Sequence, residues 1–279
     1  MKLIRKIQSI IPTYQKHGID GLIYAVLKNL KLNSKFISII EKKKYYLEKK
    51  IIKITNKTIL SGIYKSTRLT CESHWGGFDT SPKLLGFYEK QVQEKILELK
   101  NKFHLEYFIN FGASDGYHAL GLLKNNIFKY AYVFEINDKS RTIIDDNSKI
   151  NNLSEKIKIL GKANFDDFKE NLNSEKLKKT LFLIDIEGEE FKILNEINLS
   201  IFKNSILVIE NHDFLSNKED VEKFFNLMKK HFNLEILNNG SRNPNEIAEI
   251  KHFDDDEKWL LVSENRKQTM NWLIFIPKN

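Results

Sequence analysis

The stretch LFLIDIEGEEFKIL, residues Leu181 to Leu194, begins as a run of apolar residues and then collects acidic ones. Its first part has the length and composition of a buried strand, and four carboxylates follow within six residues. A strand of this kind is typical of a parallel sheet that is covered on both faces. The acids at its end indicate a site for a cation, or for chemistry that moves protons. They are Asp185, Glu187, Glu189 and Glu190.

The same pattern extends from Tyr107 to the C-terminus, where apolar strands alternate with segments of helical character. This alternation predicts a doubly wound α/β fold, in which a mostly parallel, seven-stranded sheet carries helices on both faces. A helix is expected at residues 218–232, and the last two strands are expected to pair antiparallel. The expected strands contain EYFINFG, YAYVFEI, KIKIL, TLFLIDI and SILVIEN, followed by NLEILN and NWLIFIP.

The first hundred residues are expected to be helical, because apolar residues recur there at helical spacing. Two helices fill residues 3–30, a third covers 36–54 and a fourth covers 84–99. A polar loop, CESHWGGFDTSPK at residues 71–83, separates the last two. The chain therefore divides into a helical region, residues 1–100, and a sheet domain, residues 101–279.

Composition limits the class of protein. The chain has 279 residues and one cysteine, so it can bury a core without disulfides and suits a reducing, cytoplasmic compartment. Its apolar runs are too short to cross a bilayer.

The positive charge is concentrated near the N-terminus. Residues 1–50 carry twelve Lys/Arg and three Asp/Glu, which accounts for the whole net charge of +8. We interpret these lysines as solvated helix faces, and a peripheral contact with an anionic membrane at its inner surface is the alternative. No basic and aromatic motif of a nucleic-acid reader is present, so no nucleic-acid partner is expected.

Polar residues close the successive strands, and in a parallel sheet these strand ends meet at the edge where ligands bind. The first strand is followed by a glycine turn, Gly112-Ala113-Ser114-Asp115-Gly116, and the second by Glu135. A glycine turn with an acid at the next strand end fits a nucleoside whose ribose hydroxyls bind the acid, in adenosyl cofactors and in NAD alike.

The glycine turn itself favours one of these two cofactors. It lacks the central glycine that lets a backbone approach a pyrophosphate. Asp115 would repel a dianion and attract an ammonium or a sulfonium group. S-adenosylmethionine carries both of these cations and no phosphate, so it is the better candidate.

In these residues the chain resembles the class I S-adenosylmethionine-dependent methyltransferases, and among them the FkbM type. The resemblance covers about residues 107–210 and rests on FINFGASDGYHALGLL, YVFEIND and LFLIDIEGEEFKIL, the last of which is similar to that family's Asp-x-Glu-Gly-x-Glu signature. It implies a Rossmann-like methyltransferase fold. It also implies that Gly112, Ala113 and Gly116 approach the methionine part, Glu135 binds the ribose, Asn164 contacts the adenine and Asp185 lies beside the reacting methyl.

A hydroxyl that accepts a methyl group must lose its proton, and His212 directly follows the last of the parallel strands. A histidine titrates near neutrality, so His212 is the first candidate for the general base, with Asp185 and Glu210 beside it. A divalent metal held by Asp185, Glu210 and Asp213 is the less favoured alternative, because no compact ligand motif is present.

Two of the four acids in the opening stretch have a simpler explanation. Glu189 and Glu190 begin the helix that follows Gly188, and carboxylates in the first turn of a helix are favoured by its dipole. We therefore expect a structural role for both.

Three further residues are candidates for binding the acceptor. His74 and Trp75 lie in the polar loop, which would either fold over the cofactor as a lid or remain at the surface. Arg242 lies in NGSRNPNEI, between the last two strands, and would either bind a phosphate or carboxylate or remain solvated.

These observations predict a methyltransferase (EC 2.1.1.-) that methylates a hydroxyl group. By analogy with the FkbM type, the acceptor would be a sugar or a glycan precursor in the biosynthesis of cell-surface polysaccharide. One alternative is a non-catalytic, nucleoside-binding scaffold that its basic N-terminal helices attach to a membrane or a partner. Another is NAD-dependent redox chemistry, which the charge of Asp115 opposes.

Overall fold

The computed structural model describes residues 39–72, 78–163, 173–266 and 270–278. The chain divides into two compact units, Met1–Tyr46 and Leu47–Asn279. The helices expected within residues 1–38 lie outside the described residues. Helix α2, Ile39–Thr55, confirms the helix expected at residues 36–54.

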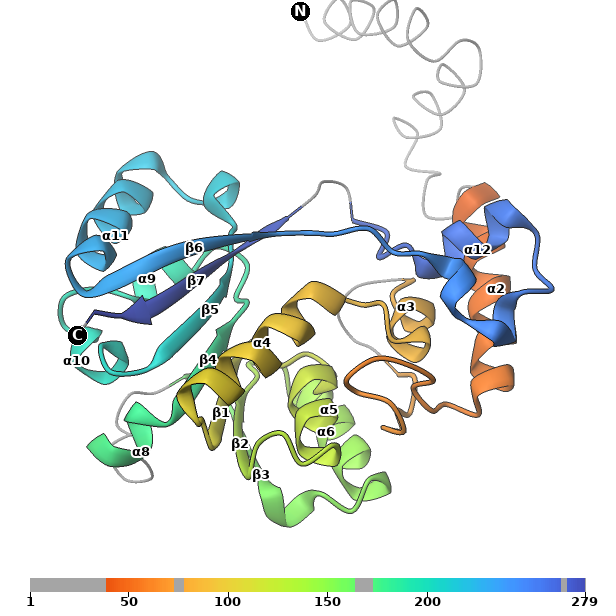
Figure 1. The fold of residues 1–279 in the computed structure, drawn as a ribbon, viewed down its shortest axis with the longest axis horizontal. Coiled ribbons are helices and arrows are strands. Elements are labelled where there is room, and N and C mark those ends of the chain that lie inside the picture. The colour runs from red at the N-terminus through yellow and green to blue at the C-terminus, as the bar shows by residue number, and fades with distance from the viewer. Residues whose placement is uncertain (1–38, 73–77, 164–172, 267–269, 279) are drawn as a thin grey trace, which may run out of the picture. The chain divides into compact units, whose positions relative to one another are not determined.

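The whole sheet belongs to the second unit. Its seven strands lie in the order β3-β2-β1-β4-β5-β7-β6, and each pair is parallel except the two that involve β7 (Figure 1). This order confirms the predicted Rossmann-like, mostly parallel sheet. The strands are β1 Tyr107–Phe111, β2 Tyr130–Phe134, β3 Ile157–Leu160, β4 Thr180–Ile184, β5 Ile206–Glu210, β6 Phe232–Asn238 and β7 Asn271–Pro277.

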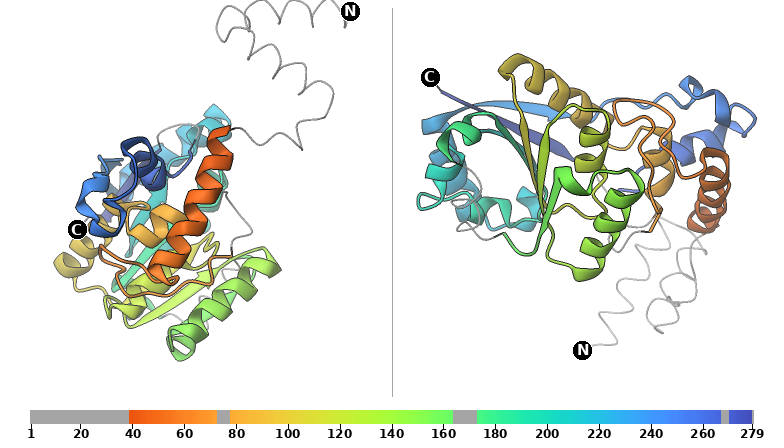
Figure 2. Two further views of the ribbon diagram at one scale, coloured as in Figure 1. Left: turned by 90° about the vertical axis from the view of Figure 1, so that its right-hand side faces the viewer. Right: turned by 90° about the horizontal axis from the view of Figure 1, so that it is seen from below.

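Helices cover both faces of the sheet, which explains why its central strands are mostly apolar (Figures 1 and 2). Every residue of β4 and β5 is buried. Successive residues of β4 belong to two separate cores: Leu181 and Leu183 to one, Phe182 and Ile184 to the other. The first core contains residues of α4 Lys90–Phe103, α5 Tyr117–Lys124 and α6 Asp138–Ile150, and the second contains residues of α9 Glu190–Ile193, α10 Leu199–Phe202 and α11 Lys218–His231.

The helix expected at residues 84–99 is wrong at its start. The structure has two helices here, α3 Thr80–Leu85 and α4, and the chain turns between them at Gly86. Gly86 has φ 81°, and a Cβ at this position would lie 2.2 Å from the carbonyl oxygen of Ser61. Helical periodicity continues across this turn, so the periodicity concealed it.

The C-terminal region confirms the expected helix and strand pair. Helix α11 leads into β6, which pairs antiparallel with β7 along its whole length. Short helices lie between β6 and β7, and another lies before β4: η4 Pro244–Glu246, η5 Ala248–Ile250, α12 Asp255–Val262 and α8 Ser174–Lys178. Two single turns, η2 Ser154–Lys156 and η3 Asp213–Leu215, precede β3 and follow β5.

One prediction about organisation stays open to test. Residues 47–100 belong to the same compact unit as the sheet, and the predicted boundary at residue 100 remains a prediction. Among the described residues, no helix is both long and apolar enough to span a membrane.

Candidate active site at the carboxyl edge of the sheet

The strand order places a topological switch point between β1 and β4. From β1 the chain moves outward to β2 and β3, and from β4 it moves the opposite way to β5. Ligands bind in parallel sheets beyond the carboxyl ends of the strands at such a point. The residues predicted from the ends of β1, β2, β4 and β5 therefore share one edge of the sheet, whereas His74, Trp75 and Asn164 lie outside the described residues.

Gly112 brings the loop after β1 against the end of β4. It has φ 76°, and a Cβ at this position would lie 1.7 Å from the carbonyl oxygen of Asp185. The backbone N–H groups of Gly112 and Ala113 both donate to the carbonyl of Phe134, the last residue of β2. The glycine loop is therefore held against both neighbouring strands, and only a residue without a side chain fits at its start.

Glu135 fastens the same loop from the end of β2. The side chain is buried, and its two carboxylate oxygens accept from the backbone N–H of Ser114 (2.9 Å) and of Asn137 (2.8 Å). Each carboxylate oxygen can accept more than one hydrogen bond. Glu135 is thus fixed in place beside the glycine loop and retains acceptor capacity for hydroxyl donors.

Asp115 has an ion-pair partner within the protein, and its role in binding the cofactor remains a prediction. Its Oδ2 lies 2.7 Å from the ammonium of Lys83, and its Oδ1 accepts from the backbone N–H of Tyr117. Lys83 also pairs with Asp79 at 2.8 Å. Burial alone would lower the pKa of Lys83, but these two carboxylates outweigh it and raise the pKa. Asp115 therefore already holds an ammonium group supplied by the protein, and its repulsion of a phosphate is weaker than its sequence position indicates.

His212 lies at the centre of a group of carboxylates and is 3% exposed. Its Nδ1 donates to Oε1 of Glu190 at 3.0 Å. Its Nε2 lies 3.4 Å from Oε2 of Glu210, 3.7 Å from Oε2 of Glu187 and 4.0 Å from Oδ1 of Asp185. The structure thus brings the three predicted catalytic residues together, with Nε2 of the histidine facing the carboxylates.

Glu190 does more than begin a helix, which is the structural role that we expected for it. Glu190 is fully buried, and besides His212 it accepts from the backbone N–H of Ile186 and of Gly188, both at 2.8 Å. It therefore builds the site, and the signal was available, since Glu190 is the last acid of the Asp-x-Glu-Gly-x-Glu pattern. Glu189 fits its expected role, because it is exposed and pairs with Lys192 at 2.7 Å.

The close carboxylates change one another's protonation. Burial raises the pKa of Asp185 well above its ordinary value, and the negative charge of Glu210 raises it further. Burial also raises the pKa of Glu210, assisted by Glu89 and opposed by Arg266. For His212, burial lowers the pKa, but the hydrogen bond to Glu190 and the surrounding carboxylates raise it overall. The site holds protons more tightly than isolated side chains would.

Arg266 is a site residue that the sequence did not reveal. Its guanidinium pairs with Glu89, Glu210 and Glu264, which come from three separate parts of the chain. Burial alone would raise the pKa of Glu89, but Arg266 and His118 lower it to about 2. Arg266 lies in no recognisable motif, so its partners become evident only in the folded chain.

Arg242 also belongs to this ion-pair network. Its Nη2 lies 2.5 Å from Oε1 of Glu264, and its side chain is 18% exposed. Its role in binding an acceptor remains a prediction, but its charge already has a partner within the protein.

A metal ion could be held by atoms of Asp185, Glu190 and His212, which lie within 4.8 Å of one another among the described residues. Both oxygens of Glu190 already accept hydrogen bonds, and a cation would have to displace them. Asp213, which the sequence offered as a metal ligand, is exposed and lies 3.4 Å from the side-chain amide of Asn211. The donor set therefore fits proton transfer better than metal binding.

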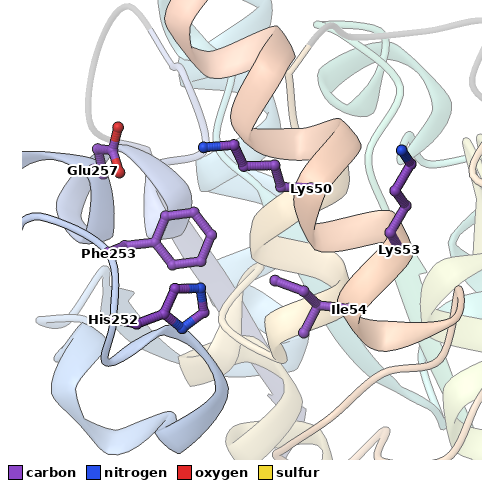
Figure 3. A pocket seen from close by; sticks show the side chains of 6 residues that line it. All are labelled: Lys50, Lys53, Ile54, His252, Phe253 and Glu257. Atoms are coloured by element: carbon purple, nitrogen blue, oxygen red, sulfur yellow. The ribbon is translucent and has the colours of Figure 1, made fainter.

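A surface hollow of about 400 Å³ shares no residue with the strand-end site (Figure 3). The ammonium of Lys50 lies 5.6 Å from the centre of the Phe253 ring at this hollow. Its remaining lining residues are Lys53, Ile54, His252 and Glu257.

No protein family and no curated protein matches this sequence. Among solved structures, the chain is similar to an O-methyltransferase from Bacillus cereus in complex with SAH, with 13% identity, 68% of this chain and 82% of that chain covered, and a TM-score of 0.48. The chain is also similar to TomG, an O-methyltransferase of tomaymycin synthesis from Streptomyces achromogenes in complex with SAM. The identity is 8%, 69% of this chain and 82% of that chain are covered, and the TM-score is 0.49. A third similar structure is a putative O-methyltransferase from Klebsiella pneumoniae, with 9% identity, 91% of this chain and 97% of that chain covered, and a TM-score of 0.48. The observed strand order establishes the fold.

Proposed function

We propose that this protein is an S-adenosylmethionine-dependent O-methyltransferase. One observation carries the proposal: the glycine loop with Glu135 and the cluster around His212 lie on the two sides of the same topological switch point. The first group offers a tight backbone turn and a carboxylate for ribose hydroxyls. The second offers side chains that can take a proton. Two such groups at adjoining strand ends fit a nucleoside donor and a hydroxyl acceptor placed side by side.

The residues present fit this cofactor in charge as well as in position. Glu135 retains acceptor capacity for two hydroxyls. The buried Oδ1 of Asp185 has no hydrogen-bond partner, and it belongs to the residue that directly follows β4. Carboxylates on both sides of the switch point favour a cationic group over a phosphate. We assign Gly112, Ala113, Ser114, Gly116 and Glu135 to cofactor binding on these grounds, with Asp185 at the boundary to the acceptor, and the sequence assigns Asn164 in addition.

S-adenosylmethionine supplies an electrophilic methyl group: the acceptor oxygen forms a C–O bond to it while the C–S bond of the sulfonium breaks. The side chains then have two tasks. They hold the hydroxyl in line with the methyl group, which is the larger contribution in a reaction of this kind. They also take the hydroxyl proton, and Nε2 of neutral His212 is our candidate, with Asp185 and Glu210 close enough to share it.

For the acceptor we propose a hydroxyl of a sugar or glycan precursor, in keeping with the resemblance of three motifs to the FkbM type. His212, together with the exposed residues that follow it, forms the acceptor side of the site in this proposal.

Calorimetric titration with S-adenosylmethionine, S-adenosylhomocysteine and NAD tests the cofactor. We expect the two adenosyl compounds to bind and NAD not to bind. Glu135→Ala should weaken adenosyl binding at least about tenfold, because a carboxylate that accepts from ribose hydroxyls is lost. A folded protein that binds neither adenosyl compound, or that binds NAD instead, would overturn the proposed function.

A further inference from the structure

Glu187 is presented to solvent in a backbone conformation that an L-residue adopts at a cost. Its φ is 56°, and its side chain is 73% exposed. The conformation is fixed from both sides, because Glu190 binds the N–H of the residue before Glu187 and of the residue after it. The hydroxyl of Ser216 adds a third bond, to the carbonyl of Gly188 (2.8 Å). Strain that is held so firmly is typical of functional positions.

An exposed aromatic ring lies near the same imidazole that Glu187 faces. Phe214 is 53% exposed, and its ring centre lies 6.0 Å from that of His212. Its segment is anchored, since the N–H of Leu215 donates to the carbonyl of His212 and Leu215 packs against Gly188. Leu215 is itself 54% exposed. The exposed side chains of Phe214 and Glu187 therefore both lie close to the buried imidazole of His212.

The carboxylates around this imidazole disfavour anions. Asp185, Glu187 and Glu210 all face Nε2 of His212. The two described guanidinium groups of the site are already paired: Arg266 with three carboxylates and Arg242 with Glu264. An acceptor with a phosphate or carboxylate near its reacting hydroxyl would meet repulsion here.

We propose that Glu187 and Phe214 form the acceptor subsite, and that it selects a sugar ring that is uncharged or carries an ammonium group. The C–H bonds on one face of such a ring meet the negative face of the Phe214 ring. A hydroxyl or ammonium group of the sugar donates to the Glu187 carboxylate. This proposal rests on the proposed function for the methyl transfer itself, and it replaces the anionic acceptor that Arg242 indicated in the sequence.

Saturation-transfer NMR on the full-length protein with S-adenosylhomocysteine tests the subsite. The four probes are methyl β-D-glucopyranoside, glucosamine, glucose 6-phosphate and glucuronic acid. We expect the first two to bind more tightly than the two anionic sugars. Phe214→Ala should weaken both at least about tenfold, and Glu187→Gln should weaken glucosamine most, because a charge-assisted hydrogen bond is lost.

Two matched variants serve as controls, and fluorescence provides a second measurement of sugar binding. Trp259→Ala removes another half-exposed aromatic residue, and Glu189→Gln removes a carboxylate two positions from Glu187, so neither should change sugar binding. If Phe214→Ala does not fold, Phe214→Trp retains a stacking ring, and its fluorescence should change when methyl glucoside is added.

Three outcomes would overturn the subsite. They are equal or tighter binding of the anionic sugars, affinities unchanged by both Phe214 and Glu187 variants, and no binding of any of the four probes. The sugar titrations are repeated without S-adenosylhomocysteine, and that compound is titrated separately by calorimetry. Failure of the proposed cofactor is therefore distinguishable from failure of the acceptor subsite.

Discussion

Nδ1 of His212 donates to Oε1 of Glu190 across 3.0 Å, and this bond joins the end of β5 to the start of α9. The bond fixes which imidazole nitrogen carries a proton in the neutral ring, and it leaves Nε2 to face the carboxylates of the site. The same Glu190 holds the backbone on both sides of Glu187. One buried carboxylate thus orients both the candidate base and the candidate acceptor residue.

The pH dependence of methyl transfer should reflect this arrangement. Because the pKa of His212 is raised above 6.5, the base is neutral only at higher pH, and kcat/KM should rise with pH to a midpoint above that value. Glu190→Gln should move the midpoint down, since the hydrogen bond to Glu190 and its charge both raise this pKa. NMR titration of the His212 ring measures the same shift without turnover. A wild-type midpoint at or below 6.5 would contradict the assignment of His212 as base.

The stability arising from His212 has a definite sign. A pKa that is raised on folding stabilises the protein below the unfolded value, and that contribution is lost as pH rises through the folded value. In Glu190→Gln this pH dependence should flatten. The variant should also lose about 1–3 kcal/mol of stability at neutral pH, because one oxygen cannot serve all three donors. Glu189→Gln, at an exposed ion pair, is the control.

Removing the charge of Asp185 should stabilise the protein and impair its function. Its raised pKa means that the ionised form is unfavourable in the folded state. Asp185→Asn should therefore increase the free energy of unfolding at pH 7 by about 1 kcal/mol or more. The gain should grow as pH rises above 3.8, the ordinary pKa of aspartate. Methyl transfer should fall at least about tenfold. Urea denaturation at pH 4 and pH 7 checks the gain, and a loss of stability at pH 7 would refute it.

Lys83 should be essential to the glycine loop. Lys83→Met leaves two carboxylates, Asp115 and Asp79, without their shared cation in a buried position. Breaking a buried pair of this kind costs about 3–5 kcal/mol. The double variant Lys83→Met with Asp115→Asn should recover part of the stability, and a double variant that is less stable than the single one would argue against the pair.

Gly112 should not tolerate a side chain. The Cβ of Gly112→Ala would lie 1.7 Å from the carbonyl oxygen of Asp185, so β4 and the loop would have to separate. We expect a loss of about 3 kcal/mol and a loss of adenosyl binding. Gly161→Ala is the matched control, because its nearest neighbouring atom lies 4.0 Å away, and its effect should stay within about 0.5 kcal/mol. Thermal unfolding and calorimetry of both variants make the comparison.

The succession of strands and helices along the chain was predictable because it depends on local patterns. Apolar runs of strand length alternate with helical periodicity, and the residue at each strand end needs no tertiary information to be identified. That rule identified the site residues at the strand ends, which are Gly112, Glu135, Asp185, Glu210 and His212. The turn at Gly86 was not predictable, because two left-handed residues, Gly86 and Glu89, break the helix while the apolar periodicity continues across it.

The sequence by itself determined the strands, the mostly parallel sheet that they form and the edge at which polar residues meet, whereas the order of the strands comes from the folded chain. Only the tertiary structure decided which of those residues pair. Glu190 meets His212 across 22 positions, Lys83 meets Asp115 across 32, and Arg266 meets Glu89 across 177. The physical reason is that secondary structure follows from the spacing of neighbouring residues, whereas the partner of a buried charge depends on which distant segments pack against it.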